Sequence, residues 1–359
     1  MRIAIDATPA LVRSAGVKNY IHHWVHYLRQ QARGDEIRVF PFLDDLGELN
    51  HEASPMGTAA TASRLAFVHA LRIFGPALLD KALGDAEVFH ASNLIRAAPR
   101  HAKLTATLHD LTSWLMPDRN TQASCEADFQ FADRILSRAD GLIAVSENTR
   151  RDAIRLLGIA PEKITTIHSG VAPEYFDATP RPRGRPYILS VGTIEPRKNF
   201  DTLLDAWKQV RTDLHKEFDL VIAGPRGWAA EETFARVRSE AIYLGYVPEL
   251  EMPGLFAGAT LFLYPSLYEG FGFPVAQALA ARVPVITSNT SALPEVARDG
   301  AALVDPADAE ALAAAIERLL DSPAERIKLA GYGRASAERF RWEKCAEQSL
   351  AFFRRVISR

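Results

Sequence analysis

The sequence predicts an α/β protein made of two doubly wound domains, each built on a parallel sheet. The chain has 359 residues, and at roughly 150 residues per domain this length favours two domains. Short apolar runs alternate with helical patterns from end to end, which is typical of βαβ units. A stretch rich in Pro and Arg at 177–186, DATPRPRGRP, separates two sets of such units and suits an exposed linker. We therefore expect a first domain over 1–179 and a second over 180–339.

Each half contains about six strand candidates. Those of the first half are Arg2–Ile5, Ile37–Phe42, Val88–His90, Leu104–Leu108, Leu142–Val145 and Ile164–Ile167. Those of the second half are Tyr187–Val191, Leu220–Ala223, Ile242–Leu244, Leu261–Tyr264, Pro284–Thr287 and Ala302–Val304. The last stretch, at about 340–359, has the pattern of an amphipathic helix, which we expect to pack back on the first domain. Ligands of open parallel sheets bind outside the carboxyl ends of strands, so a motif directly after a strand is a site candidate.

Charge and cysteine content exclude several classes of protein. The formal net charge is −2, which lacks the basic excess of a protein that holds nucleic acid over its whole surface. The two cysteines, Cys125 and Cys345, form neither a disulfide framework nor a Cys-x-x-Cys metal pattern. The N-terminus lacks the pattern of a secretory signal, and no apolar run reaches the roughly 20 residues that span a bilayer. We expect a cytoplasmic protein.

One segment bears on membrane contact. The stretch 63–84, SRLAFVHALRIFGPALLDKALG, mixes apolar and basic residues at helical spacing, which suits a helix lying on a membrane surface. A surface helix packed on its own sheet has the same pattern and is the interpretation we favour. Peripheral contact with the inner face of a membrane remains the alternative.

The most informative motif is LYPSLYEGFGFPVAQALA at 263–280. It predicts a strand ending near Tyr264, a loop holding Glu269, and a helix with Pro274 in its first turn. Glycines in the loop allow close approach of the backbone, and a helix N-terminus attracts anionic or hydroxyl oxygens. An ionised carboxylate accepts hydrogen bonds from hydroxyls but repels phosphate, so Glu269 suits a sugar.

A second motif, SVGTIEPRKNFDTLLDAW at 190–207, places two cations after a strand. Gly192 allows a tight turn, and Arg197 and Lys198 precede a helix that we expect to begin near Asn199. A guanidinium binds two oxygens at once and an ammonium acts as a point charge, so the pair suits a diphosphate. We expect both side chains to be exposed.

Together these motifs resemble the donor-binding half of the retaining glycosyltransferases of family four. The resemblance implies the GT-B fold, in which two Rossmann-like domains face a central cleft. By the resemblance, Glu269 contacts hydroxyls of the donor sugar, while Gly270, Phe271 and Gly272 offer backbone donors. The family has a second glutamate, for the ribose of the nucleotide, at the eighth position after the first; here that position is Gln277, whose amide oxygen still accepts one hydrogen bond.

The resemblance also assigns the second motif and its neighbours. Arg197 and Lys198 match the family's phosphate-binding cations, next to Gly192. Thr193 stands where many members have an arginine, and Arg197 supplies the charge in the Glu-Pro-Arg-Lys-Asn version. The stretch 245–247 (Gly245, Tyr246 and Val247) matches a segment that lies against the nucleotide base through its backbone, although a simple core role for Tyr246 and Val247 fits equally well.

Two weaker signals lie in the first half. The loop Ser14-Ala15-Gly16-Val17-Lys18 follows the first strand and resembles the family's glycine loop, in which Gly16 approaches the donor diphosphate. His109 follows a strand and precedes Asp110, matching a family segment whose histidine donates a hydrogen bond to the transferred sugar. A lone histidine is otherwise more often structural.

No motif predicts a metal or a bound cofactor. His22, His23 and His26 lack a nearby set of carboxylates, and Asp44-Asp45 has the wrong spacing for magnesium. Walker and dinucleotide-binding fingerprints are absent.

The resemblance therefore implies a metal-independent, retaining hexosyltransferase that uses a nucleotide-sugar donor and a carbohydrate or lipid-linked carbohydrate acceptor. The Glu-Pro-Arg-Lys-Asn version favours mannose from GDP-mannose in surface polysaccharide or glycolipid assembly. A UDP-sugar-dependent transferase, an inactive nucleotide-sugar-binding protein of the same fold, and a GT-B epimerase or phosphorylase remain alternatives.

Overall fold

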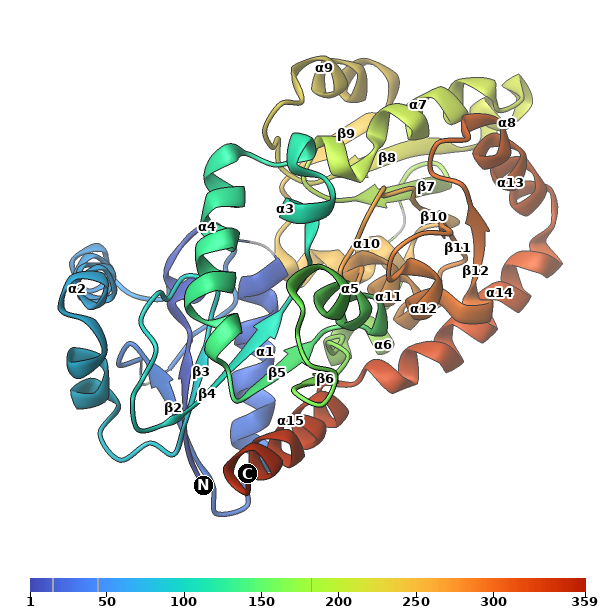
Figure 1. Cartoon of the computed structure of the whole chain (residues 1–359). Helices are drawn as coiled ribbons and strands as arrows, with labels where there is room; N and C mark the ends of the chain where they lie inside the picture. The colour runs from blue at the N-terminus through green and yellow to red at the C-terminus, as the bar shows by residue number, and fades with distance from the viewer. Residues whose placement is uncertain (15, 44, 182) are drawn as a thin grey trace. The chain divides into compact units, whose positions relative to one another are not determined.

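The computed structural model describes residues 1–359 except 15, 44 and 182 (Figure 1). The described chain divides into two compact units: unit 1 comprises Met1–Gly170 and Trp342–Arg359, and unit 2 comprises Val171–Arg341. Ala15, in the predicted glycine loop, and Asp44, in the acidic loop, lie outside the described residues. The two units are described separately below.

Unit 1 is built on a parallel sheet of six strands in the order β2-β1-β3-β4-β5-β6. Its strands are β1 (Arg2–Asp6), β2 (Glu36–Phe40), β3 (Val88–Ala91), β4 (Lys103–Leu108), β5 (Gly141–Ala144) and β6 (Ile164–Thr166). Its helices are α1 (Gly16–Gln31), α2 (Thr58–Leu83), α3 (Thr112–Leu115), α4 (Gln122–Arg134), α5 (Glu147–Leu157) and α15 (Trp342–Ile357), with 3-10 turns at Thr8–Leu11, Pro117–Arg119 and Leu136–Arg138. Buried β-branched and aromatic residues fill the strands, as expected for a sheet covered on both faces.

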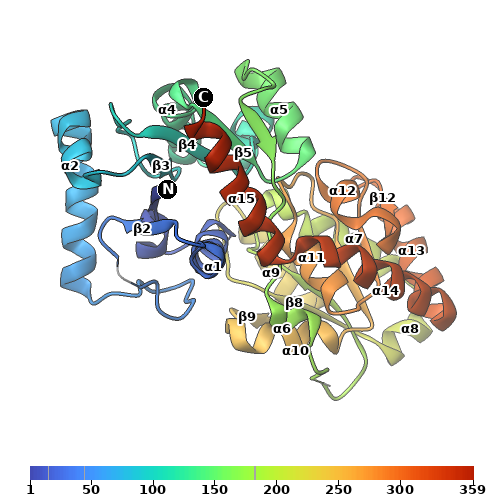
Figure 2. The same ribbon diagram turned by 90° about the horizontal axis from the view of Figure 1, so that it is seen from below.

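The C-terminal helix α15 packs against α1 within unit 1 (Figure 2). The indole N–H of Trp24 on α1 donates to the hydroxyl of Ser349 on α15 at 2.9 Å. Beneath α15, a Cβ at Gly141 would come within 2.7 Å of Val356, so the close approach of this helix to β5 requires a glycine there.

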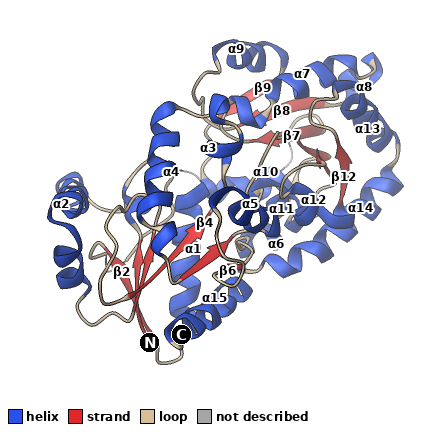
Figure 3. Ribbon diagram, in the orientation of Figure 1, coloured by secondary structure: helices blue, strands red, loops and turns tan. Residues whose placement is uncertain are grey.

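Unit 2 is built on a second parallel sheet of six strands, in the order β12-β11-β10-β7-β8-β9. Its strands are β7 (Tyr187–Val191), β8 (Asp219–Ala223), β9 (Ile242–Gly245), β10 (Leu261–Tyr264), β11 (Val285–Ser288) and β12 (Ala301–Val304). Its helices are α6 (Pro173–Phe176), α7 (Phe200–Gln209), α8 (Thr212–Glu217), α9 (Glu231–Glu240), α10 (Met252–Ala257), α11 (Phe273–Ala280), α12 (Leu293–Ala297), α13 (Ala309–Asp321) and α14 (Pro323–Ala337). Short 3-10 turns lie at Pro196–Lys198, Glu249–Glu251, Arg298–Gly300 and Glu338–Phe340, and helices flank the strands of each sheet (Figure 3).

The expected strands are all present, with ends displaced by two residues at most. The largest displacement is at β2, which ends at Phe40 where we expected Phe42, because Pro41 has no N–H with which to continue the ladder. Apolar runs between polar turns are a strong signal in a parallel sheet, since both faces of each strand are buried.

The division of the chain differs from the expected boundary at 179 and 180. The structure divides the chain after Gly170, because the next residues are joined to the far end of unit 2: Val171 N–H donates to Phe340 O at 2.6 Å. Helix α6 is held there as well, with the guanidinium groups of Arg334 and Arg341 lying 4.7 and 4.0 Å from the ring centroid of Phe176. The described residues of the Pro- and Arg-rich stretch, 177–181 and 183–186, therefore belong to unit 2, and most of them are exposed.

Candidate active site

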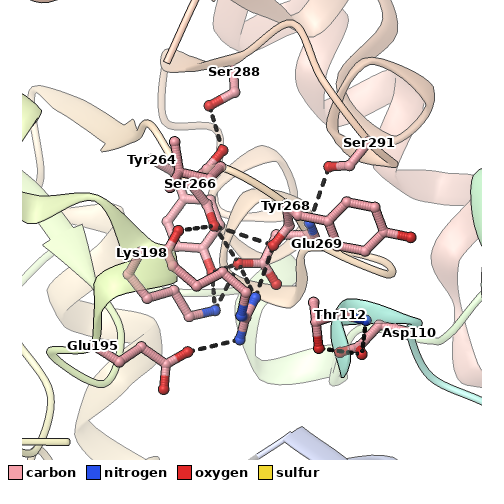
Figure 4. Close-up of polar contacts among 12 residues, drawn as sticks. Asp110, Thr112, Glu195, Lys198, Tyr264, Ser266, Tyr268, Glu269, Ser288 and Ser291 are labelled. Atoms are coloured by element: carbon pink, nitrogen blue, oxygen red, sulfur yellow. Dashed lines mark hydrogen bonds and ion pairs between the residues drawn. The ribbon is translucent and has the colours of Figure 1, made fainter. Parts of the chain in front are cut away.

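A buried carboxylate, Glu269, occupies the loop between β10 and α11 of unit 2 (Figure 4). Its contacts gather on one oxygen, Oε1. This atom lies 2.7 Å from Lys198 Nζ and 2.9 Å from Arg197 Nη1. It also accepts hydrogen bonds from the hydroxyls of Tyr264, at 2.9 Å, and Ser266, at 2.7 Å. Oε2 accepts no hydrogen bond from the described residues.

The loop that carries Glu269 is fixed by backbone and hydroxyl hydrogen bonds. The hydroxyl of Ser288, at the end of β11, donates to Ser266 O at 2.7 Å, and the N–H of Glu269 donates to the Ser291 hydroxyl at 3.0 Å. Because these partners belong to the neighbouring strand and its loop, the sheet itself positions the carboxylate.

The two cations come from the 3-10 turn after β7. Arg197 Nη1 donates to Tyr268 O at 2.8 Å, and Arg197 Nη2 lies 2.8 Å from Glu195 Oε1. Lys198 Nζ donates to the Tyr264 hydroxyl at 2.7 Å. Only 15% of the Arg197 side chain and 12% of the Lys198 side chain are exposed, so the expectation of two exposed cations is wrong. Both cations are therefore largely shielded from solvent, and each pairs with the buried carboxylate of Glu269.

The two carboxylates of this cluster have opposite pKa shifts. Burial by itself would raise the pKa of Glu269, but the nearby charges of Arg197 and Lys198 outweigh burial and bring the pKa to about 2. Burial raises the pKa of Glu195 more than the same two cations lower it. Glu269 is therefore ionised at neutral pH, and an ionised carboxylate only accepts hydrogen bonds.

Backbone packing beside the cations depends on glycines. The N–H of Gly192 donates to Ala223 O at 2.9 Å, and Gly192 itself has room for a side chain. Glycine is required instead at Gly224, in the loop that faces Gly192. Gly224 has φ +139°, and a side chain there would collide with the Gly192 carbonyl. A Cβ at Gly227 would likewise come within 2.8 Å of the Thr193 methyl, so this loop and the loop of the cations lie backbone to backbone.

The stretch after β9 exposes a ring. Gly245 has φ +66°, and its carbonyl accepts from Gly224 N–H at 2.8 Å. Tyr246 is exposed and Val247 half-buried, so the alternative that Tyr246 is a core residue is wrong. The stretch thus borders the loop that packs on the cations.

At the start of α11, Gly272 is a required glycine. It has φ +94°, and a Cβ there would come within 2.7 Å of Leu293 Cδ2. Gly270 and Phe271 precede it in the same buried loop. The Phe271 ring packs edge-on against Phe273 and Phe340, with centroids 5.3 and 5.2 Å away, so its side chain serves the core.

In unit 1, His109 follows β4. The ring of Tyr20 packs edge to face with it at 4.9 Å, and burial lowers its pKa to about 4. His109 is therefore neutral at pH 7 and donates from one ring nitrogen only. The neighbouring Asp110 accepts from the N–H and hydroxyl of Thr112, at 3.0 and 2.7 Å (Figure 4). Gly16 begins α1, and a Cβ there would touch nothing within 4 Å.

Comparisons with known proteins match both halves of the chain to glycosyltransferases. Residues 14–175 match the family described as Glycosyltransferase Family 4, and residues 171–336 match Glycosyl transferases group 1. The chain belongs to this glycosyltransferase family.

Relatives of this glycosyltransferase include mannosyltransferases. The chain is 28% identical to O-antigen chain mannosyltransferase B of Escherichia coli over 98% of each chain. It is 33% identical to MMP alpha-(1->4)-mannosyltransferase of Mycolicibacterium hassiacum over 63% of this chain and 56% of that protein.

Solved structures show the same GT-B fold. Sucrose-phosphate synthase from Thermosynechococcus elongatus superposes with a TM-score of 0.76 at 22% identity, covering 100% of this chain and 99% of that one. Anabaena HepE in complex with UDP and glucose gives 0.70 at 16% identity, covering 98% and 99%.

Gln277, which departs from the family pattern, is half-buried in α11. Its side chain makes no hydrogen bond to the described residues. An amide has two donor positions on nitrogen as well as acceptor sites on oxygen, so Gln277 offers a ligand hydroxyl either kind of partner.

Three residues that contact Glu269 or Arg197 were not predicted as site residues from the sequence. They are Glu195, Tyr264 and Ser266. Each lies inside a motif already singled out, directly after β7 or at the end of β10. A polar side chain at the carboxyl end of a strand was the available signal. Among residues 1–359 without 15, 44 and 182, no group of three or more His, Cys, Asp or Glu side chains is placed to hold a metal ion.

Proposed function

We propose that this glycosyltransferase moves a hexose from a nucleotide-sugar donor to a hydroxyl of a carbohydrate or lipid-linked carbohydrate. Mannose from GDP-mannose is the favoured donor, in surface polysaccharide or glycolipid assembly. The name of a relative that covers 98% of this chain, O-antigen chain mannosyltransferase B, supports the choice of mannose. The observation that carries the proposal is the cluster of the buried Glu269 with Arg197 and Lys198, which combines a hydroxyl acceptor with two cations.

The cluster has the groups needed to help a diphosphate leave. The ammonium of Lys198 has three N–H donors, and its hydrogen bonds to Tyr264 and Glu269 use two. We infer that the third donates to a phosphate oxygen as negative charge develops there. A donor already held in place pays no cost of reorientation during the reaction, which is why preorganised charge speeds such steps.

We propose transfer with retention of configuration and without a metal. The bond from the anomeric carbon to the phosphate oxygen breaks, and a bond from that carbon to the acceptor oxygen forms on the same face. The proton of the acceptor hydroxyl passes to the leaving phosphate oxygen, so no separate base is needed. Arg197 and Lys198 supply the positive charge that a metal supplies elsewhere.

Two alternatives have their own support. The structural resemblance to a protein solved with UDP and glucose favours a UDP-sugar donor. Gln277 in place of a carboxylate favours a protein that binds a nucleotide sugar weakly or without turnover. Both alternatives keep the same cluster in the same role toward the sugar and the phosphates.

A donor panel tests the proposal. Purified protein is incubated with GDP-mannose, UDP-glucose and related donors, with and without EDTA, and nucleotide diphosphate release is followed. Release from GDP-mannose that survives EDTA supports the proposal, and the anomeric coupling in the NMR spectrum of the product reports retention. Binding of no donor by calorimetry would refute the transferase, whereas binding without release would favour the inactive form.

We also propose a cytoplasmic location. Cys125 and Cys345 are both buried free thiols, as is typical of a reducing compartment. Fractionation of cells that express the tagged chain tests the location directly.

A further inference from the structure

Helix α2 of unit 1 is apolar, long and poorly covered. It spans Thr58–Leu83, and by length and composition it is apolar enough to cross a membrane, so the expectation that no apolar run reaches that length is wrong. Only 17% of its most apolar window is buried. A soluble helix normally turns its large apolar side chains toward the core. Most of this helix is instead open to contact with a surface.

The buried residues of α2 anchor it to unit 1. Val68, Leu71, Leu79 and Leu83 belong to the same core cluster as Phe40 and Phe89. To cross a bilayer, the helix would have to withdraw these side chains from the sheet, at the cost of the core. Figure 2 shows α2 at the outer edge of this unit, with the strands on one side of it only. The helix can thus lie along a surface without leaving the fold.

The uncovered side of α2 has an apolar tip. Ile73 is 70% exposed and Phe74 is 69% exposed, and they directly precede a break in the helix at Gly75 (φ +66°) and Pro76. The exposed positions before this tip are mostly small: Thr58, Ala59, Ala62, Ser63, Ala66, His69 and Arg72. Small side chains allow close approach to a surface, and two large apolar side chains at one end can enter it.

Helix α2 carries an excess of positive charge. Arg64 and Arg72 lie in its first half and Lys81 in its last turn, and no Asp or Glu occurs between Glu52 and Asp80. Asp80 is itself engaged by Arg100, whose N–H donates to it at 2.9 Å. A second copy of this face would bring like charges together, whereas an anionic lipid surface is complementary to them.

We propose that α2 docks this protein on the surface of an anionic lipid bilayer, with Ile73 and Phe74 inserted among the acyl chains and Arg64, Arg72 and Lys81 at the headgroups. An interfacial helix combines these same two contributions, apolar burial and attraction to anionic lipid. The proposal stands independently of the donor and of transfer, since it uses no residue of the cluster around Glu269.

Co-sedimentation with vesicles tests the proposal on the full chain. Vesicles of phosphatidylcholine alone are compared with vesicles containing about 30% phosphatidylglycerol, a fraction that gives a clear negative surface potential. We expect binding to the anionic vesicles, and an at least tenfold loss of binding in the double variant Ile73→Ser/Phe74→Ser. The triple variant Arg64→Gln/Arg72→Gln/Lys81→Gln should lose the preference for anionic lipid.

Matched controls lie in unit 2. Ile327 is 74% exposed, so Ile327→Ser removes an equally exposed apolar side chain and should bind like the unchanged protein. Lys216→Gln/Arg238→Gln removes exposed cations of unit 2 and is the control for the triple variant. It should keep the preference for anionic lipid. The proposal is overturned if the unchanged protein does not sediment with anionic vesicles, or if Ile73→Ser/Phe74→Ser and Ile327→Ser behave alike. A dimer in solution that Ile73→Ser/Phe74→Ser abolishes, without lipid binding, would assign the face to a second copy instead.

A fluorescent probe gives a local readout. Both native cysteines are buried, so Ala66→Cys on the exposed side of α2 can be labelled selectively with a polarity-sensitive dye. Its emission should shift to the blue on adding anionic vesicles, and a dye on Ile327→Cys should not respond. Equal shifts at both positions would show nonspecific adsorption and overturn the proposal.

Discussion

Replacing Glu269 by Gln removes one charge from the buried cluster and almost nothing from its shape. The pKa of Glu269 is about 2, against an ordinary value of 4.5, and each pH unit between these values corresponds to about 1.4 kcal/mol. The ionised carboxylate therefore stabilises the folded state by about 3 kcal/mol at pH 7, which is comparable to the cost of breaking a buried ion pair. We expect Glu269→Gln to lower the free energy of unfolding by about this amount.

The pH dependence of this loss has a definite sign. A carboxyl whose pKa is lower in the folded protein contributes its full stabilisation above its unfolded pKa, and the contribution disappears as the pH falls through its folded pKa. The stabilisation by Glu269 is therefore lost as the pH falls from about 4.5 to about 2. The difference between the unchanged protein and Glu269→Gln should therefore be constant from pH 7 to pH 5 and shrink toward zero below that.

Urea unfolding followed by tryptophan fluorescence measures this difference. Trp207 is buried in the core of unit 2 and reports on the unit that holds the cluster. Glu231→Gln is the matched control, because Glu231 also pairs with an arginine, Arg226, but at the surface. Two results would contradict this prediction. One is an equal loss of the free energy of unfolding in the two variants at pH 7, and the other is a loss in Glu269→Gln that persists at pH 2. Either result would show that the charge of Glu269 does not stabilise the fold.

Four further outcomes are expected. Lys198→Ala should slow nucleotide diphosphate release at least about 100-fold, as loss of a preorganised charge does; normal release would remove it from the reaction. Gln277→Glu should tighten donor binding in calorimetry, and an unchanged Kd would count against a ribose contact. Gly272→Ala should cost about 1–3 kcal/mol in thermal unfolding, because φ is +94° there, whereas Gly16→Ala, with nothing within 4 Å, should be nearly neutral. Because the pKa of His109 is about 4, the pH profile of kcat/KM should show no His109 inflection between pH 5.5 and 8; one near 6.5 that vanishes in His109→Asn would contradict this.

Much of the fold could be predicted because parallel strands leave a plain local signal. Runs such as Tyr187–Val191 and Leu261–Tyr264 are buried on both faces, so their apolar residues stand together in the sequence. The boundary between the units, after Gly170, leaves no such local signal in the sequence. It depends on Val171 pairing with Phe340, and a contact between such distant residues leaves no local pattern.

The site was partly visible for the same reason. Glu269 and Arg197 lie in the loops that follow β10 and β7, and the rule that ligands bind at the carboxyl ends of strands selects those loops. Tyr264 was expected only as the end of a strand, and Glu195 only as part of a motif. Their roles depend on where side chains of other segments lie, which a linear pattern does not record.

The sequence by itself determined the order of strands and helices and the chemistry placed after each strand, because propensity, periodicity and turn residues act locally. Only the tertiary structure decided that Lys198 and Glu269, 71 residues apart, share a hydrogen bond, and that Arg197 Nη1 lies 2.9 Å from the same carboxylate oxygen. It also decided that α2, expected as a surface helix packed on its own sheet, leaves Ile73 and Phe74 exposed. Burial and charge pairing depend on which segments the fold brings together, and that follows from packing of the whole chain.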